Sequence, residues 1–93
     1  MTTYLLRCEV DPARSAEMPQ LRAAHLAHIG TRADDIVFGG VVGADDGPPV
    51  EIVIVLSASS ADDVASWVAT DPYAPLYLRT STSEFHLRLP FAT

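Results

Sequence analysis

Polar and apolar residues alternate with a period of two from Thr3 to Val10. The apolar set falls on one face, and it consists of Tyr4, Leu6, Cys8 and Val10. Such alternation is typical of a strand that packs one face against a core. The single cysteine of the chain lies on this inner face, so we expect a buried and inert thiol.

Two further strands are predicted in the middle of the chain. Residues 36–42 are β-branched or aromatic apart from Gly39-Gly40, and paired glycines in a strand mark a bulge or a close approach by a ligand or another backbone. Residues 44–49 predict a turn centred on Asp46-Gly47. Residues 50–56 predict a third strand, and its residues 52–56 are apolar on both faces, which indicates a strand that is covered on both sides.

The last strand is predicted from Thr80 to Leu89, with Phe85, Leu87 and Leu89 on one face. The loop before it carries Tyr73 and Tyr77. These tyrosines either wall a pocket or cover the end of the preceding helix.

Two segments have helical periodicity. The first runs from Pro12 to Gly30, with Asp11 as the expected N-cap and Pro12 at the first helical position. The second begins with the capping pattern of residues 60–63 and ends near Thr70. Its buried stripe is expected to consist of Ala61, Val64, Ala65 and Val68.

The first helix carries polar residues where apolar ones are expected. At about 100° per residue, His25 and Arg22 fall inside the stripe formed by Met18, Leu21, Leu26 and Ile29. A buried polar group without a partner costs about 1–3 kcal/mol. These side chains therefore either have structural partners or line a cavity.

The order of elements is β-α-β-β-α-β, which predicts an α+β, ferredoxin-like fold. A single domain over residues 1–93 is expected, with a four-stranded antiparallel sheet and both helices on one face. Apolar residues make up 48% of the chain, and the third strand is apolar on the face that the helices leave open. We therefore expect a homodimer that packs these faces together as a dimeric α/β barrel.

Charge and composition exclude several classes of partner. The net charge is −6 and the six basic residues are scattered arginines, so neither nucleic acid nor an anionic membrane surface is an expected partner. No signal peptide and no apolar run of about 18–20 residues is present, and one cysteine forms no internal disulfide, so a cytoplasmic protein is expected. No metal motif, phosphate loop or nucleophile elbow occurs, which favours a site without a cofactor.

Several motifs together resemble the YciI-like (YCII-related) family of the dimeric α/β-barrel superfamily. They are Arg22-x-x-His25-Leu26, Phe38-Gly39-Gly40, Asp71-Pro72-Tyr73 and the closing segment of residues 85–91. The chain departs from the family at Gly40-Val41, where the family often has Gly-Pro, and at residues 74–76, where it usually has a glycine. The resemblance implies that His25 and Asp71 form a catalytic dyad. Some members of the family are linked to dehydrochlorination of hydroxylated aromatic rings.

The chemistry of the residues fits that implication. An imidazole with a pKa of about 6.5 can take up and return a proton near neutral pH, and a carboxylate on one ring nitrogen fixes its tautomer. We expect a cofactor-independent lyase or isomerase for a small cyclic or aromatic ligand, in which Arg22, Tyr73, Gly39 and Gly40 bind the substrate. The alternatives are a non-catalytic small-molecule-binding or regulatory dimer, and a polar cluster that only ties the helices together.

Overall fold

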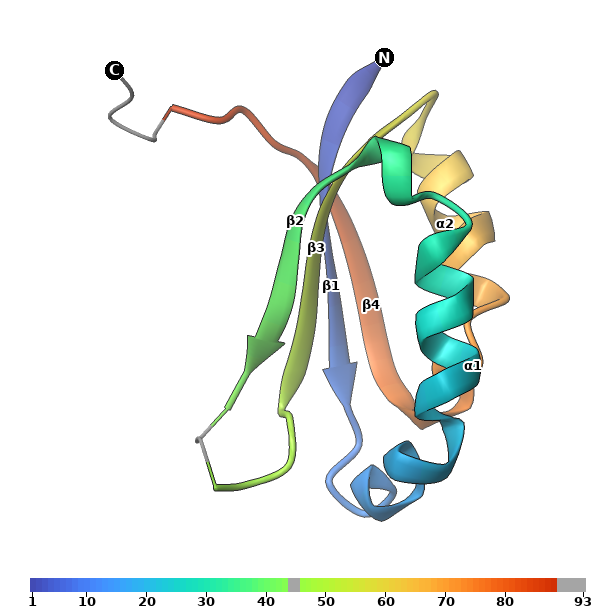
Figure 1. The fold of residues 1–93 in the computed structure, drawn as a ribbon. Helices are drawn as coiled ribbons and strands as arrows, with labels where there is room; N and C mark the ends of the chain where they lie inside the picture. The colour runs from blue at the N-terminus through green and yellow to red at the C-terminus, as the bar shows by residue number, and fades with distance from the viewer. Residues whose placement is uncertain (44–45, 89–93) are drawn as a thin grey trace.

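The computed structural model describes residues 1–43 and 46–88 (Figure 1). Strands and helices follow one another as β1 (Thr2–Val10), α1 (Met18–Gly30), β2 (Ile36–Val42), β3 (Glu51–Ala58), α2 (Ala61–Ala69) and β4 (Tyr77–Glu84). Short 3₁₀ turns precede α1, β2 and β4 at Ser15–Glu17, Ala33–Asp35 and Ala74–Leu76. The predicted β-α-β-β-α-β order is confirmed, and the range predicted for the second strand matches β2.

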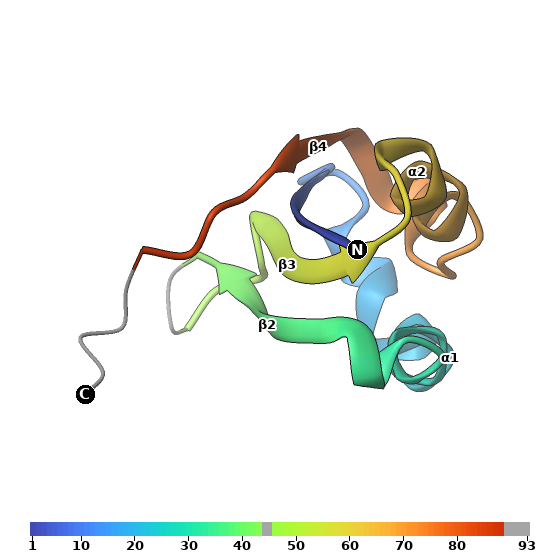
Figure 2. The same ribbon diagram turned by 90° about the horizontal axis from the view of Figure 1, so that it is seen from above.

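The four strands form one antiparallel sheet in the order β2-β3-β1-β4. Viewed from above, both helices lie on the same face of this sheet (Figure 2). This is the predicted ferredoxin-like arrangement.

The hydrophobic core lies between the sheet and the helices. The inner face of β1 is buried as predicted, with Leu6, Cys8 and Val10 between 0% and 2% exposed. They pack with buried residues of β3, α2 and the segment before β4, which are Ile52, Ile54, Leu56, Ala58, Val64, Val68, Tyr73 and Leu76.

Helix α1 begins at Met18, six residues after the predicted start at Pro12. The reason is Pro19, which has no N–H to donate and whose ring would collide with the preceding turn of a helix begun at Pro12. Pro19 is accommodated only because it falls in the first turn of α1. Asp11 does not cap α1; its Oδ1 atom accepts a hydrogen bond from the Ala13 N–H at 2.9 Å in the preceding turn.

The helical stripes are narrower than predicted. On α1 only Met18 and His25 are buried, while Leu26 is 53% exposed because it lies beside a cavity rather than in the core. On α2 the buried residues are Val64 and Val68, whereas Ala61 and Ala65 are exposed. The predicted N-terminus of α2 is confirmed, since the Ser60 hydroxyl accepts a hydrogen bond from the Asp63 N–H at 3.0 Å.

The predicted last strand is displaced along the chain. Strand β4 spans Tyr77–Glu84, so the prediction of Thr80–Leu89 placed it too late. Pairing with β1 fixes the true position, because Tyr77 pairs with Val10 and Glu84 pairs with Tyr4. Residues 85–88 follow after the end of β4, where the Phe85 N–H still donates to the carbonyl oxygen of Thr3 at 2.9 Å, and Leu89 lies outside the described residues.

The predicted turn between β2 and β3 is only partly described. Ala44 and Asp45 lie outside the described residues, and Asp46 stands in a turn.

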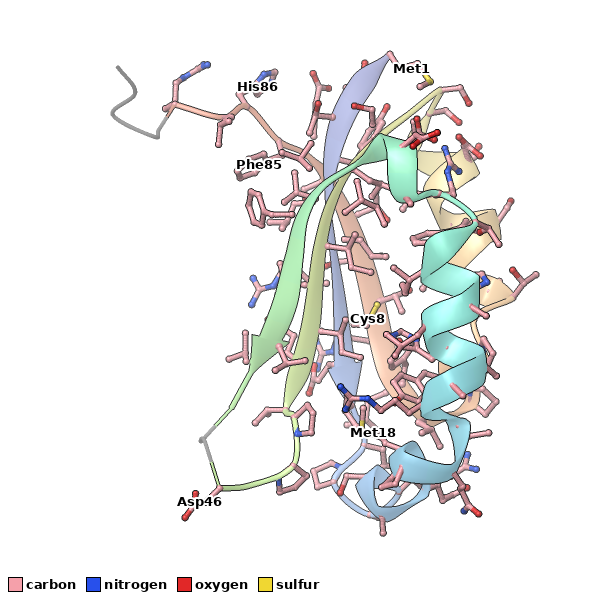
Figure 3. The ribbon with its side chains drawn as sticks, in the orientation of Figure 1. Met1, Cys8, Met18, Asp46, Phe85 and His86 are labelled. Atoms are coloured by element: carbon pink, nitrogen blue, oxygen red, sulfur yellow. The ribbon has the colours of Figure 1, made fainter. Side chains whose placement is uncertain are left out.

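The sheet face opposite the helices is partly covered by the chain itself. A cross-strand row on this face contains Leu5, Val55 and Phe38, and Val55 is 0% exposed. The segment after β4 crosses to this side (Figure 2), and the Phe85 ring packs edge-on against Phe38 with centroids 6.1 Å apart. Figure 3 shows Phe85 on the side of the sheet away from α1. The chain therefore covers part of this face with its own residues, although Phe38 remains 47% exposed.

Candidate active site

The structure joins His25 of α1 to Asp71, which follows α2. The Nδ1 atom of His25 lies 2.8 Å from Oδ1 of Asp71, and the two residues are only 8% and 4% exposed. They are the buried polar residues among those the structure describes. The histidine that interrupted the apolar stripe of the sequence therefore has a carboxylate partner from the opposite half of the chain.

The carboxylate of Asp71 is held by several donors. Oδ1 also accepts the backbone N–H of Tyr73 at 2.9 Å, and Oδ2 accepts the hydroxyl of Tyr77 at 2.8 Å. Tyr73 follows Asp71 by two residues, and a bond from its N–H to the Asp71 side chain is the pattern of an Asx turn. Burial raises the pKa of Asp71, but the hydrogen bonds from His25, Tyr73 and Tyr77 outweigh it, and the net pKa lies below its usual value.

An ionised Asp71 determines the tautomer of the imidazole. A carboxylate only accepts hydrogen bonds, so Nδ1 of His25 must donate. In the neutral ring Nε2 then carries the lone pair, and it has no hydrogen-bond partner among the described residues. The Tyr73 ring stacks on the imidazole at 3.9 Å between centroids and 11° between planes, which fixes the plane of the ring.

The His25 ring lines a cavity of about 590 Å³ between α1 and the β2 side of the sheet. Its wall is mostly apolar and includes Met18, Leu26, Ile29, Ile36, Val41, Pro48, Pro49, Ile52 and Ile54. Cavities of this size and lining are typical of small-molecule sites. A group with a free lone pair therefore stands at an apolar cavity, which permits proton transfer to or from a small ligand.

The residues predicted to bind the substrate lie around the same cavity. Arg22, Tyr73, Gly39 and Gly40 all contribute to its lining, whereas Asp71 lies behind His25 and does not. A side chain at Gly39 would be crowded by the neighbouring strand, because a Cβ atom there would stand 3.2 Å from the carbonyl oxygen of Val53. The sequence thus identified a set of residues that the fold brings together.

Arg22 differs from most of the arginines of the chain in having no carboxylate partner among the described residues. Arg7, Arg14, Arg32 and Arg79 each form an ion pair with a carboxylate, but Arg22 forms none within the described residues. Its charge acts on Tyr73, where burial raises the pKa of the phenol and Arg22 opposes that rise. The arginine is therefore available to a negatively charged ligand at the cavity.

Tyr77 is the residue whose contact with the dyad was not predicted. The sequence left open whether it walls a pocket or covers the end of α2. Its hydroxyl instead bonds to Asp71. The six-residue spacing from Asp71 crosses a 3₁₀ turn and gives no periodic signal, so no sequence pattern could have identified this bond.

No group of three or more His, Cys, Asp or Glu side chains within residues 1–43 and 46–88 is arranged to hold a metal ion. In the same residues, neither helix has the length and apolar character needed to cross a bilayer.

Solved structures resemble this chain, whereas no protein-family model and no curated protein matches it. A 5-chloro-2-hydroxyhydroquinone dehydrochlorinase from Burkholderia phenoliruptrix AC1100, solved with 2,5-dihydroxybenzoquinone, is 26% identical with a TM-score of 0.79. The match covers 90% of this chain and 93% of that chain.

More distant neighbours share the fold alone. A NIPSNAP family protein from Agrobacterium tumefaciens is 17% identical with a TM-score of 0.56, over 97% of this chain and 94% of that one. A candidate antibiotic biosynthesis monooxygenase from Nitrosomonas europaea is 14% identical with a TM-score of 0.52, over 96% of this chain and 100% of that one. The chain thus has the ferredoxin-like fold of the dimeric α/β-barrel superfamily.

Proposed function

We propose that this protein is a cofactor-independent lyase or isomerase that moves a proton on a small, ring-hydroxylated molecule. The observation that carries the proposal is the buried His25–Asp71 pair, 2.8 Å long, at the wall of an apolar cavity. The similarity to a dehydrochlorinase supports the choice of reaction class. Within the superfamily, the motifs around His25 and Asp71 favour a YciI-like single domain over residues 1–93.

In this reaction His25 is the general base. Its Nε2 lone pair accepts a proton from a ring hydroxyl or from an acidic ring carbon, and the new imidazolium is stabilised by the carboxylate of Asp71. In an elimination from the keto tautomer of the substrate, the electron pair of the broken O–H or C–H bond forms a new π bond, and the leaving group departs from a tetrahedral ring carbon with the electron pair of its own bond. In an isomerisation, Nε2 returns the proton to another carbon.

The cavity favours a flat anionic substrate. Its mostly apolar wall and the Tyr73 ring suit the faces of an aromatic or quinonoid ring. Arg22 supplies the one positive charge among the lining residues, and it can pair with a phenolate or enolate oxygen. The charge of the whole chain is −6, so this local cation is what makes an anion acceptable at the site.

The test uses two small molecules and one variant. Binding of 2,5-dihydroxybenzoquinone is measured by calorimetry, and turnover of 5-chloro-2-hydroxyhydroquinone is measured as chloride release. We expect His25→Asn to lower turnover by about 10²–10⁴-fold, the usual share of a general base, while binding of the quinone changes little. His86→Asn, which alters an exposed histidine outside the cavity, is the matched control and should behave like the wild type.

Two results would contradict the proposal. Equal chloride release by the wild type and by His25→Asn would remove His25 from the reaction. Binding of the quinone by a wild-type protein that turns over no chlorinated or unsubstituted hydroxyhydroquinone would favour the alternative, a non-catalytic small-molecule-binding or regulatory protein.

A further inference from the structure

A buried chain of hydrogen bonds continues past the dyad. His25 bonds to Oδ1 of Asp71, and Oδ2 of the same carboxylate accepts the hydroxyl of Tyr77 at 2.8 Å. Tyr77 is not part of the cavity wall that His25 and Tyr73 share. It therefore reaches the reacting nitrogen only through Asp71.

From this geometry we propose that Tyr77 is a positioning residue, which holds the Asp71 carboxylate in the orientation that serves His25. The inference rests on the proposed function of the dyad and extends it to a residue that does not contact the substrate.

The two carboxylate oxygens of Asp71 differ in their partners. Oδ1 has two donors, from His25 and from the Tyr73 backbone, whereas Oδ2 has the Tyr77 hydroxyl as its partner among the described residues. Because Asp71 is only 4% exposed, water is a poor substitute for that donor. Loss of the hydroxyl leaves Oδ2 unpaired, so the carboxyl group either rotates away from Nδ1 or takes up a proton.

The backbone places the phenol for this role. Between Glu9 and Val10 the pairing of β1 with β4 shifts, so that Glu9 opposes Arg79 while Val10 opposes Tyr77, and Leu78 is the extra residue. An extra residue in a strand redirects the side chains beside it. Here it brings Tyr77 level with the buried Val10, on the side of the sheet where Asp71 lies.

The surroundings keep Tyr77 a donor. Burial raises the pKa of its phenol, and the nearby Cys8 and Asp71 raise it further. Burial also raises the pKa of the Cys8 thiol to about 12. Both groups remain neutral near pH 7, so Asp71 is the single negative charge among the three.

Tyr77→Phe tests the inference because it removes one oxygen and keeps the ring. We expect kcat for 5-chloro-2-hydroxyhydroquinone to fall by about 10- to 100-fold, as for other groups that orient a reacting side chain, with KM within about twofold. Tyr4→Phe, which alters a partly buried tyrosine on β1, is the matched control and should change none of these values.

A second measurement is independent of turnover. Carbon-13 NMR of the Asp71 carboxyl follows its titration directly, and in Tyr77→Phe the midpoint should move to higher pH while thermal unfolding remains cooperative. An unchanged Asp71 midpoint together with an unchanged kcat would overturn the inference. If the wild type turns over no substrate, the proposed function fails, but the Asp71 titration still decides whether Tyr77 positions the carboxylate.

Discussion

At the scale of single residues, Arg22 and Arg32 illustrate two uses of the same side chain. Arg32 is bound on several sides: its guanidinium donates two hydrogen bonds to Asp63 at 3.1 Å and lies 5.9 Å from the centroid of the Trp67 ring. Arg22 is exposed and has no ion pair within the described residues, yet it lines the cavity. Arg32 ties the segment after α1 to α2, whereas Arg22 has no carboxylate partner that would compete with a ligand.

This contrast predicts opposite outcomes for two alanine substitutions. Arg22→Ala should leave the free energy of unfolding within about 0.5 kcal/mol of the wild type and weaken binding of anionic 2,5-dihydroxybenzoquinone about tenfold. Arg32→Ala should lower the free energy of unfolding by about 1–2 kcal/mol and leave binding unchanged, because the bonds to Asp63 are lost away from the cavity. Urea unfolding and calorimetry measure the two effects. Equal loss of binding in both variants would mean that Arg22 acts through the fold.

At the scale of elements, β2 combines an edge position with two glycines of different surroundings. The side of Gly39 that would carry a Cβ atom faces the helices, where Val53 and Ile54 leave little space. The corresponding position at Gly40 has no atom within 4 Å. The two glycines therefore have different reasons to be there.

We predict that Gly39→Ala lowers the free energy of unfolding by about 1–3 kcal/mol, because a methyl group 3.2 Å from a backbone oxygen forces the strands apart. Gly40→Ala should be neutral or stabilising by up to about 1 kcal/mol, since alanine restricts the unfolded chain. Thermal or urea unfolding of the two variants provides the comparison. Equal costs at the two positions would mean that the short distance from Gly39 to Val53 does not decide the difference.

Element by element, the sequence was informative where the side chains repeat. The alternation of β1 and the β-branched run of β2 predicted both strands, and His25 was conspicuous because it interrupts an apolar stripe. Strand β4 was misplaced because its own residues are polar, whereas Phe85 and Leu87 beyond it imitate a strand pattern. The bond from Tyr77 to Asp71 depends on a local shift in strand pairing, and such shifts leave no periodic trace.

At the scale of the whole molecule, the titrating groups predict stability that falls on both sides of neutral pH. Asp71 has a folded pKa below its ordinary value of 3.8, so its ionised form stabilises the fold above that pH, and this contribution is lost as the pH falls through the folded value. Cys8 has a folded pKa raised from 9.0 to about 12, so stability is lost as the pH rises through that interval. Tyr77 acts in the same direction above its ordinary value of 10.0.

Urea unfolding at pH 3, 7 and 10.5 tests this expectation, with the highest free energy at pH 7. Asp71→Asn should reduce the loss on the acidic side, and Cys8→Ala should reduce it on the alkaline side. A free energy of unfolding that is constant from pH 7 to pH 10.5 would contradict the role given to the buried thiol and phenol.

The exposed outer face of the sheet predicts that two chains associate. The outer face of the sheet keeps exposed apolar side chains on β2, including Phe38 at 47% and Val42 at 49%. We expect a homodimer that buries this face, with a sedimenting mass of about 20 kDa, twice the 10.0 kDa of one chain. Val53→Asp should shift the mass toward one chain, and Ser66→Asp on the exposed side of α2 should not. A wild-type protein that sediments as a single chain at micromolar concentration would exclude the dimer.

The strand order has a consequence for how the protein acquires its structure. The first half of the chain supplies β1 and β2, the second half supplies β3 and β4, and in the order β2-β3-β1-β4 every pair of neighbours joins one strand from each half. None of these strand pairs can therefore form within the amino-terminal half alone, and the partner of His25 lies 46 residues later in the chain. We therefore expect the sheet and the His25–Asp71 contact to form late and together, since both depend on contacts that are distant in sequence. Formation of the His25–Asp71 contact would then report that the chain has completed its fold.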